Sequence, residues 1–262
     1  MQALRTAATG MAAQQLNVEV ISNNIANMNT VGFKRQSAVF EDLLYQTQEQ
    51  PGAQSSDQGT VVPTGIQIGV GVKAGSTYTI TSQGTLTNTG NSLDLAINGP
   101  GYFQVLLPTG ETAYTRAGNF STNAQGQIVT QDGFLVQPTM TVPQNSTNLT
   151  VSQDGQVQVM TPGNTTPTVV GQLQIATFLN DSGLEATGNN LFMESAASGP
   201  ATVANPGTAG YGVTMQGFTE ASNVDPVTEI TNLIVAQRAY EMNSKVVTTA
   251  DQMLSTAVNT KS

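Results

Sequence analysis

The sequence predicts an α+β protein in which two terminal α-helices pair as a coiled coil, with a central, mostly β domain and an extended connecting segment. Three observations predict this class. Apolar residues recur at helical spacing near both ends of the 262-residue chain. The middle alternates polar and apolar residues, with turn dipeptides at hairpin spacing. A stretch rich in Gln, Ser, Gly and Pro follows the first helix.

These patterns divide the chain into four parts. We expect the N-terminal helix of a coiled-coil domain in residues 1–32, and an extended connecting or locking segment in residues 33–69. Residues 70–218 form the predicted β domain, and residues 219–262 contain the C-terminal helix of the coiled-coil domain.

The first helix is predicted from Gln2 to about Asn27, a range without proline. Its apolar positions recur at steps of three, four or seven residues, which is a heptad-like pattern. Gly10 weakens it by about 1 kcal/mol relative to alanine unless a close backbone contact needs the glycine. The residues expected to form its apolar seam are Leu4, Ala7, Met11, Val18, Ile21 and Ile25.

The last helix is predicted from Pro226 to about Val258. Asp225 and Pro226 suit its N-cap and first-turn positions, because aspartate accepts the unpaired N–H groups and proline has none to lose. Ser222 with Asp225 is a competing capping box. The larger side chains of the expected seam are Ile230, Leu233, Tyr240, Val247 and Leu254, and Ala236, Asn243, Ala250 and Ala257 lie on the adjoining line.

The central part contains three predicted hairpins. Residues 102–107 pair with 111–116, residues 127–131 with 134–137, and residues 149–153 with 156–160. The last two are joined by Asp132-Gly133 and Asp154-Gly155, and Asp-Gly is typical of type I′ turns, in which both central residues have positive φ.

Residues 46–65, QTQEQPGAQSSDQGTVVPTG, allow two interpretations. A solvated linker accounts for the polar composition and the lack of a sustained apolar pattern. Alternatively, the segment is an extended hairpin or loop that becomes ordered only against a neighbouring subunit. The sequence leaves both open.

Charge and composition exclude several functions. With 8 basic and 17 acidic residues, the net charge of −9 argues against binding nucleic acid, which needs a basic surface. No His or Cys is present, so the commonest zinc, thiolate and imidazole sites are absent, and we expect no metal and no cofactor. No apolar run is long enough to cross a bilayer. Lys34-Arg35 is expected to be a solvated pair, or else to bind a carboxylate of a partner.

An enzyme on a β scaffold is the alternative from another functional class. A polysaccharide hydrolase needs two carboxylates facing each other. The available carboxylates are Asp94, Asp132, Asp154, Asp181 and Glu185, but the turn sequences explain Asp132, Asp154 and Asp181 better. Because no other chemistry stands out, the sequence favours a protein that is not an enzyme.

The two helices predict assembly. Each has one apolar stripe that would be exposed to water if the helix stood alone. Burying this stripe contributes about 25 cal/mol of stabilising free energy per Å² of apolar surface. The helices could pack on each other and also on other copies of the chain. If the rotation between neighbouring copies does not close into a ring, the product is a filament or tube. An intramolecular helical hairpin beside a β domain is the simpler alternative.

Two sequence runs resemble the bacterial flagellar rod and hook protein family. The first is SNNIAN at 22–27 followed by GFKR at 32–35, and the second is QGFTEASNV at 216–224 followed by QRAYE at 237–241. The two signatures lie at opposite ends and in the family's order. The signature residues are Asn23, Asn24, Asn27, Gly32, Phe33, Gln216, Gly217, Ser222, Asn223, Arg238 and Tyr240.

Within this family, the sequence is most similar to the distal rod branch. Residues 40–46, 50–56, 65–69 and 94–105 carry this likeness, which extends over essentially the whole chain. Residues 28–31, Met-Asn-Thr-Val, depart mildly from the usual pattern. The proximal rod and hook branches are the nearer alternatives.

The resemblance implies a structural subunit of a rigid helical tube that transmits torque and serves as an export channel. It implies contacts with copies of itself, proximal rod proteins, hook protein, the P-ring and L-ring proteins and the export apparatus. It also implies a place in the flagellar basal body, from periplasm to outer membrane, reached without a cleaved signal peptide. The residues expected to lock subunits together are Gln50, Pro51, Gly52, Gln54, Ser55 and Ser56.

Overall fold

The computed structural model describes residues 2–51, 64–146, 148–163 and 166–259. They form two compact units, each assembled from segments far apart in the sequence. The helical unit takes its described residues from 2–25, 36–51, 64–78 and 226–259. The β unit takes them from 26–35 and from the described part of 79–225.

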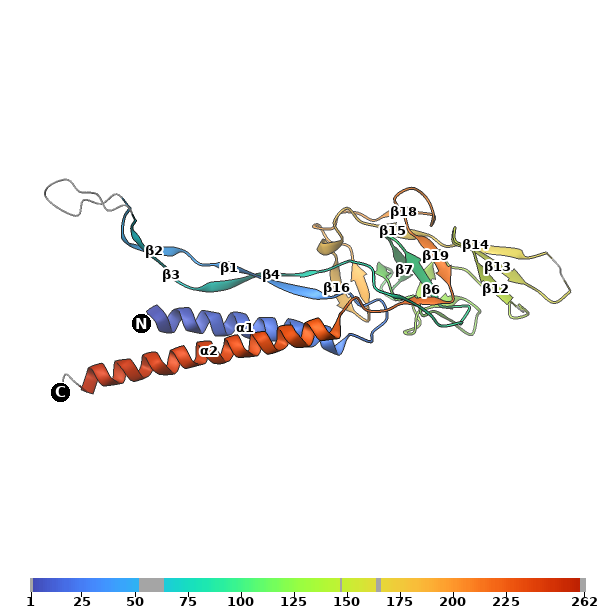
Figure 1. Cartoon of the computed structure of the whole chain (residues 1–262). Coiled ribbons are helices and arrows are strands. Elements are labelled where there is room, and N and C mark those ends of the chain that lie inside the picture. Colours follow the sequence, from blue (N-terminus) through green and yellow to red (C-terminus); the bar gives the residue numbers. More distant parts are fainter. Residues whose placement is uncertain (1, 52–63, 147, 164–165, 260–262) are drawn as a thin grey trace. The chain divides into compact units, whose positions relative to one another are not determined.

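Two long helices run side by side in opposite directions in the helical unit (Figure 1). Helix α1 is Gln2–Ala26 and helix α2 is Pro226–Asn259, so each predicted helix end lies within one residue of the observed one. Pro226 occupies the first position of α2, where its missing N–H breaks no hydrogen bond. The predicted pair of terminal helices is therefore confirmed as secondary structure.

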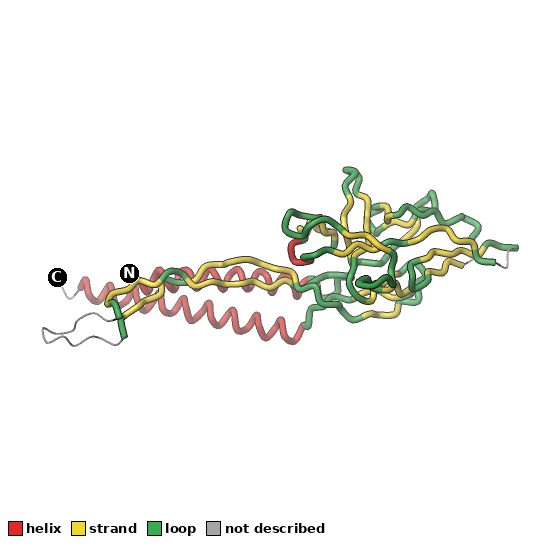
Figure 2. The backbone as a smooth tube through the Cα atoms, turned by 90° about the horizontal axis from the view of Figure 1, so that it is seen from above, coloured by secondary structure: helices red, strands yellow, loops and turns green. Residues whose placement is uncertain are grey.

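A narrow two-stranded ribbon follows α1 in the same unit (Figure 2). Strand β1 (Gln36–Asp42) pairs with β4 (Val72–Thr79), and β2 (Tyr45–Glu49) pairs with β3 (Ile66–Gly69). The flanks of the 46–65 segment are thus arms of a hairpin, while residues 52–63 lie outside the described residues. Strand β4 lies in the ribbon, and the β unit begins its second stretch at Thr79, whereas the sequence analysis placed the start of the β domain at residue 70.

The β unit contains a nine-stranded sheet, a three-stranded sheet and two strand pairs. The nine strands are β7 (Tyr102–Leu106), β8 (Thr112–Thr115), β9 (Ser121–Thr122), β10 (Ile128–Val129), β11 (Leu135–Gln137), β15 (Ile175–Thr177), β16 (Glu185–Gly188), β17 (Leu191–Met193) and β18 (Thr202–Ala204). The three-stranded sheet comprises β12 (Asn148–Val151), β13 (Gln156–Met160) and β14 (Thr168–Gln172). Strand β6 (Leu95–Asn98) pairs with β19 (Val213–Gln216), and β5 (Leu86–Asn88) with β20 (Phe218–Glu220).

All three predicted hairpins are present, as β7/β8, β10/β11 and β12/β13. The predicted type I′ turns are wrong. Gly133 and Gly155 have φ of 84° and 81°, but neither Asp132 nor Asp154 is among the described non-glycine residues with positive φ. The Gly133 and Gly155 N–H groups donate to the carbonyls three residues earlier, as in a type I turn completed by a glycine bulge.

The main core of the β unit lies where the sheets meet. Phe103 of β7, Val157 of β13 and Ile175 of β15 are fully buried there. Phe103 packs edge-on against Phe120, with ring centroids 5.1 Å apart. This core holds the polar residues of the site described next in fixed positions.

Candidate functional site

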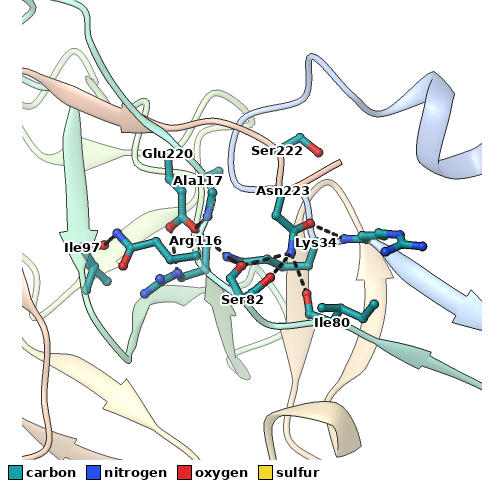
Figure 3. Close-up of polar contacts among 12 residues, drawn as sticks. Lys34, Ile80, Ser82, Ile97, Arg116, Ala117, Glu220, Ser222 and Asn223 are labelled. Carbon is teal, nitrogen blue, oxygen red and sulfur yellow. Dashed lines mark hydrogen bonds and ion pairs between the residues drawn. The ribbon is translucent and has the colours of Figure 1, made fainter. Parts of the chain in front are cut away.

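A buried ion-pair cluster connects the two signature runs within the β unit (Figure 3). Lys34, which follows α1, places its Nζ 2.5 Å from Oε1 of Glu220 on β20. Arg116, just after β8, places its Nε 3.0 Å from the other oxygen of Glu220. All three residues are at most 5% exposed. The expectation that Lys34 is solvated is wrong.

Glu220 is positioned by backbone contacts as well as by charge. Its Oε1 also accepts a hydrogen bond from Gly84 N–H at 2.9 Å, and its carbonyl accepts one from Gly32 N–H at 2.8 Å. Burial lowers the pKa of Lys34, and the adjacent Glu220 carboxylate opposes this shift. Two cations converge on one carboxylate, so removing Glu220 leaves two uncompensated buried charges.

Asn223 makes a second clamp beside this cluster (Figure 3). Its Oδ1 accepts a hydrogen bond from Arg35 N–H at 2.7 Å, and its Nδ2 donates to the carbonyls of Ile80 and Ser82. One amide side chain therefore ties its own segment to two others, at Arg35 and at residues 80–82. Ser222 accepts a hydrogen bond from Val224 N–H, which forms a local turn.

The backbone geometry at position 32 requires a glycine, which explains why Gly32 is part of the signature. Its φ is 72°, and a Cβ there would lie 2.6 Å from the backbone nitrogen of Ala117. Phe33 is half-buried, and Asn27 accepts a hydrogen bond from the Thr30 hydroxyl in the preceding turn.

Gln216 and Gly217 connect strands of the β unit. The Gln216 side chain accepts from Val151 N–H and donates to the carbonyls of Ser92 and Leu149. Gly217 has a φ of 77°, and its N–H donates to Asp94. These two signature residues therefore position strands of the β unit and are not reactive groups.

Asn24 forms the corresponding contact in the helical unit. It is 1% exposed, and its side chain exchanges two hydrogen bonds with the backbone of Gln36 at the start of β1. The same amide donates to the buried carboxylate of Glu229 on α2 at 3.2 Å. One signature asparagine therefore joins α1, the ribbon and α2. Its neighbour Asn23 is exposed.

Further along, α1 also contacts both the ribbon and α2. The Thr9 hydroxyl accepts from Val72 N–H, and the Thr6 hydroxyl donates to the Val70 carbonyl. A Cβ on Gly10 would lie 2.9 Å from the Asn243 amide of α2. The Asn243 side chain thus occupies the space beside Gly10, where any larger residue would displace it.

The predicted seams are only partly covered. In α1, Ala7 and Ile21 are buried, and Leu4, Met11, Val18 and Ile25 are half-buried. In α2, Ala236 and Ala250 are buried and Leu233 and Val247 are half-buried, but Ile230, Tyr240 and Leu254 are 50%, 43% and 40% exposed. The line of small residues on α2 faces inward. The line of larger side chains on α2 therefore lies at the edge of the contact between the helices.

Other predicted residues lie on the surface or outside the described ranges. Arg238 forms an exposed ion pair with Glu241 on α2. In the proposed locking segment, Gln50 and Pro51 are exposed. Gly52, Gln54, Ser55 and Ser56 lie outside the described residues.

The carboxylates considered for an enzyme are scattered. Asp94 accepts hydrogen bonds from Thr89 and Asn91 within a local turn, while Asp132 and Asp154 lie in hairpin turns. Nowhere in the described ranges do three or more His, Cys, Asp or Glu side chains gather closely enough to hold a metal ion. No helix in the described parts of the chain has the length and apolar character that crossing a bilayer requires.

Family models match three parts of the chain. Residues 4–34 match the flagella basal body rod protein model, residues 96–159 the flagellar hook protein FlgE/F/G D1 domain, and residues 215–260 the flagellar basal body rod FlgEFG protein C-terminal model. The terminal matches include Lys34 and Glu220, so the ion-pair cluster joins two family segments.

Relatives that match this chain over nearly its whole length narrow the assignment within the family. The flagellar basal-body rod protein FlgG of Caulobacter vibrioides is 70% identical over 254 residues, covering 97% of each chain. FlgG of Buchnera aphidicola (Baizongia pistaciae) is 52% identical over 96% of each chain. FlgF of Caulobacter vibrioides is only 35% identical, over 92% of this chain and 90% of its own. The hook, proximal rod and enzyme alternatives are not favoured, and the chain belongs to the FlgG family of flagellar distal rod proteins, which are structural proteins of the basal body and not enzymes.

Proposed function

We propose that copies of this chain assemble into a rigid helical tube, the distal rod, that carries torque from motor to hook and encloses an export channel. The exposed apolar surface of α2 supports this proposal most strongly. Only Glu229, Ala236 and Ala250 of this 34-residue helix are buried. Ten large apolar side chains of α2 are 40–73% exposed: Val227, Ile230, Ile234, Val235, Tyr240, Met242, Val246, Met253, Leu254 and Val258.

Such a helix gains stability when neighbouring copies cover its apolar side chains. Val235 and Met242 are seven residues apart, as are Val246 and Met253, and this is the spacing of a coiled-coil seam. The coiled-coil contact therefore forms between α1 and α2 of one copy and the helices of its neighbours. A continuous wall of paired helices resists twisting because each helix is packed on several sides.

The ribbon supplies a second contact in this proposal. Leu44 is 88% exposed, Tyr45 58% and Ile66 50%, and these apolar side chains suit a surface that another copy covers. Together with Gln50, Pro51, Gly52, Gln54, Ser55 and Ser56, they form the inter-subunit lock that stiffens the rod.

The proposed neighbours follow from the place of the distal rod. They are proximal rod proteins below, hook protein above and the P-ring and L-ring proteins around the rod, which extends from periplasm to outer membrane. The subunit reaches this place through the flagellar export apparatus. The low content of charged residues, 10%, limits ion pairing with the rings.

Charge substitution in α2 tests the assembly. Leu233→Asp and Val247→Asp place a carboxylate in the helix contact, and Met242→Asp places one on the exposed stripe, so that the monomer itself is little disturbed. We expect all three to abolish polymerisation and motility, as measured by sedimentation, electron microscopy and swimming assays. The thermal unfolding of the β unit should stay unchanged.

Thr248→Asp is the matched control, since it adds the same charge at an exposed polar position of α2. It should polymerise normally. Normal rods from Met242→Asp and Leu233→Asp would refute the proposal.

A further inference from the structure

A polar pocket of about 340 Å³ lies in the β unit, beside the ion-pair cluster. The loop containing Gly99 and Gly101, the Tyr102 and Arg116 side chains and the Asp181 carboxylate line it, together with residues 81–83. The family relationship assigns no role to this pocket, and the ion pairs of Glu220 do not fill it.

Three polar groups at this pocket make no hydrogen bond to any described residue. Arg116 uses Nη1 for the carbonyls of Gly99 and Gly101 and Nε for Glu220, which leaves Nη2. The Tyr102 hydroxyl is the second group, although Tyr102 is only 4% exposed. The Asp181 carboxylate is the third. Two donors and one acceptor that make no other hydrogen bond therefore line the same pocket, where a ligand can bind all three.

The two donor side chains of the pocket are held in place by other contacts. The Arg116 guanidinium lies over the Tyr102 ring, 5.8 Å from its centroid, and is fixed by its three other contacts. Tyr102 is itself held edge-on by Phe178 and Phe192. Asp181 begins a short 3-10 turn, Asp181–Gly183. The two donors are therefore in place before a ligand binds, which lowers the entropic cost of binding.

The arrangement requires a ligand with both an acceptor and a donor. Arg116 Nη2 and the Tyr102 hydroxyl can both donate, and Asp181 accepts. Burial raises the pKa of Asp181, which makes its charged form less favoured. A neutral hydrogen-bond donor is therefore a sufficient partner for this carboxyl group. A carboxylate ligand would be repelled by the like charge of Asp181, and an ammonium ligand would be repelled by the like charge of Arg116. A carboxamide satisfies both sides: its oxygen accepts from Arg116 and Tyr102, and its NH₂ donates to Asp181.

We propose that this pocket binds the carboxamide side chain of an asparagine or glutamine from a second copy of the chain. The chain carries 21 asparagines and 25 glutamines, so a neighbouring copy presents this group abundantly. Leu179, two residues before Asp181, is fully exposed, and covering it favours a protein surface over a small molecule. The choice of a second copy rests on the proposed assembly, whereas the carboxamide preference does not.

A titration of the full-length monomer tests the chemistry. The probe is N-acetyl-glutamine methylamide, and N-acetyl-glutamate methylamide is its matched control. We expect localised NMR shifts for residues 81–83, 99–102 and 181 with the glutamine probe, at an affinity in roughly the millimolar range for so small a ligand. The glutamate probe should bind about tenfold or more weakly.

Isosteric variants complete this test. Tyr102→Phe and Asp181→Asn should each weaken binding of the glutamine probe by about three- to tenfold. Tyr211→Phe removes a hydroxyl that bonds elsewhere, to the Thr202 carbonyl, and should leave binding unchanged. Equal shifts with both probes, no shifts, or no effect of Tyr102→Phe and Asp181→Asn would overturn the carboxamide site.

Crosslinking tests the source of the carboxamide. A photo-crosslinking residue at Ser82 is used in polymers mixed from ¹⁴N- and ¹⁵N-labelled subunits. We expect mixed-isotope crosslinks to a peptide containing asparagine or glutamine. Crosslinks only within one copy, or none in normal polymers, would overturn the second-copy source. Failure to polymerise at all would instead contradict the proposed function, and the titration would still decide the pocket chemistry.

Discussion

At the scale of single residues, Glu220 is a buried carboxylate that two buried cations share. It neutralises Lys34 and Arg116, which come from segments 82 residues apart in the sequence. Burying three charges is costly in itself, and the cluster is stable only while it is complete. It therefore makes the correct meeting of three segments a condition for folding of the β unit.

Glu220→Gln tests this role. The amide keeps the shape of the side chain but removes the charge between two buried cations, so we expect the free energy of unfolding of the β unit to fall by roughly 3–5 kcal/mol. Urea denaturation measures it. Glu241→Gln, which removes the carboxylate of an exposed ion pair with Arg238, is the control and should cost less than about 1 kcal/mol. Equal losses in the two variants would contradict a special role for the buried cluster.

Asp181 predicts a pH effect. Burial raises the pKa of this carboxyl above its usual 3.8, so the folded state favours the protonated acid. Its contribution to stability is therefore fully present below pH 3.8 and is lost as the pH rises through the folded-state pKa. We expect Asp181→Asn to raise the free energy of unfolding at pH 7, with the gain vanishing as the pH falls below 3.8.

Urea unfolding at a series of pH values measures the effect. A gain that does not change between pH 3 and pH 7 would show that charge burial is not its cause. The same substitution is expected to weaken ligand binding, so stability and binding should change in opposite directions at neutral pH, as at a site shaped for a ligand.

At the scale of elements, the start of α2, the end of α1 and the start of β1 share one asparagine. Asn24→Ala removes three hydrogen bonds and leaves the N–H of the half-buried Gln36 without its acceptor. We expect a loss of roughly 2–4 kcal/mol in the helical unit, since each buried unsatisfied group costs about 1–3 kcal/mol. Amide hydrogen exchange at Gln36 should accelerate in parallel.

Ser22→Ala, on the exposed side of α1, is the matched control and should change stability by less than about 0.5 kcal/mol. Unchanged exchange at Gln36 in Asn24→Ala would show that the ribbon is held by other contacts, such as those of Thr6 and Thr9.

At the scale of the whole molecule, the ribbon predicts rod stiffness. Deleting residues 46–65 removes most of β2 and the proposed locking residues. We expect export to continue and rods to bend or loosen, because each subunit loses an inter-subunit contact. Electron microscopy of isolated rods measures their curvature. A Gly/Ser replacement of equal length separates the effect of side chains from that of length, and straight, equally stiff rods from the deletion would contradict the lock.

The sequence by itself determined both helices, the three hairpins and the family. Helical spacing and Asp-Gly turns are local signals, so α1, α2, β7/β8, β10/β11 and β12/β13 could be predicted from neighbouring residues. The two signature runs also marked Asn24, Gly32 and Asn223, but not what these residues contact.

Only the tertiary structure decided the ribbon, the ion-pair cluster and the pocket. Strands β1 and β4 pair across 29 intervening residues, and Lys34 meets Glu220 across 186 positions. Nothing local in the sequence distinguishes a lysine that will be buried from one that stays in water. Burial of a charge depends on the carboxylate that folding brings to it, and this long-range pairing is a property of the folded chain.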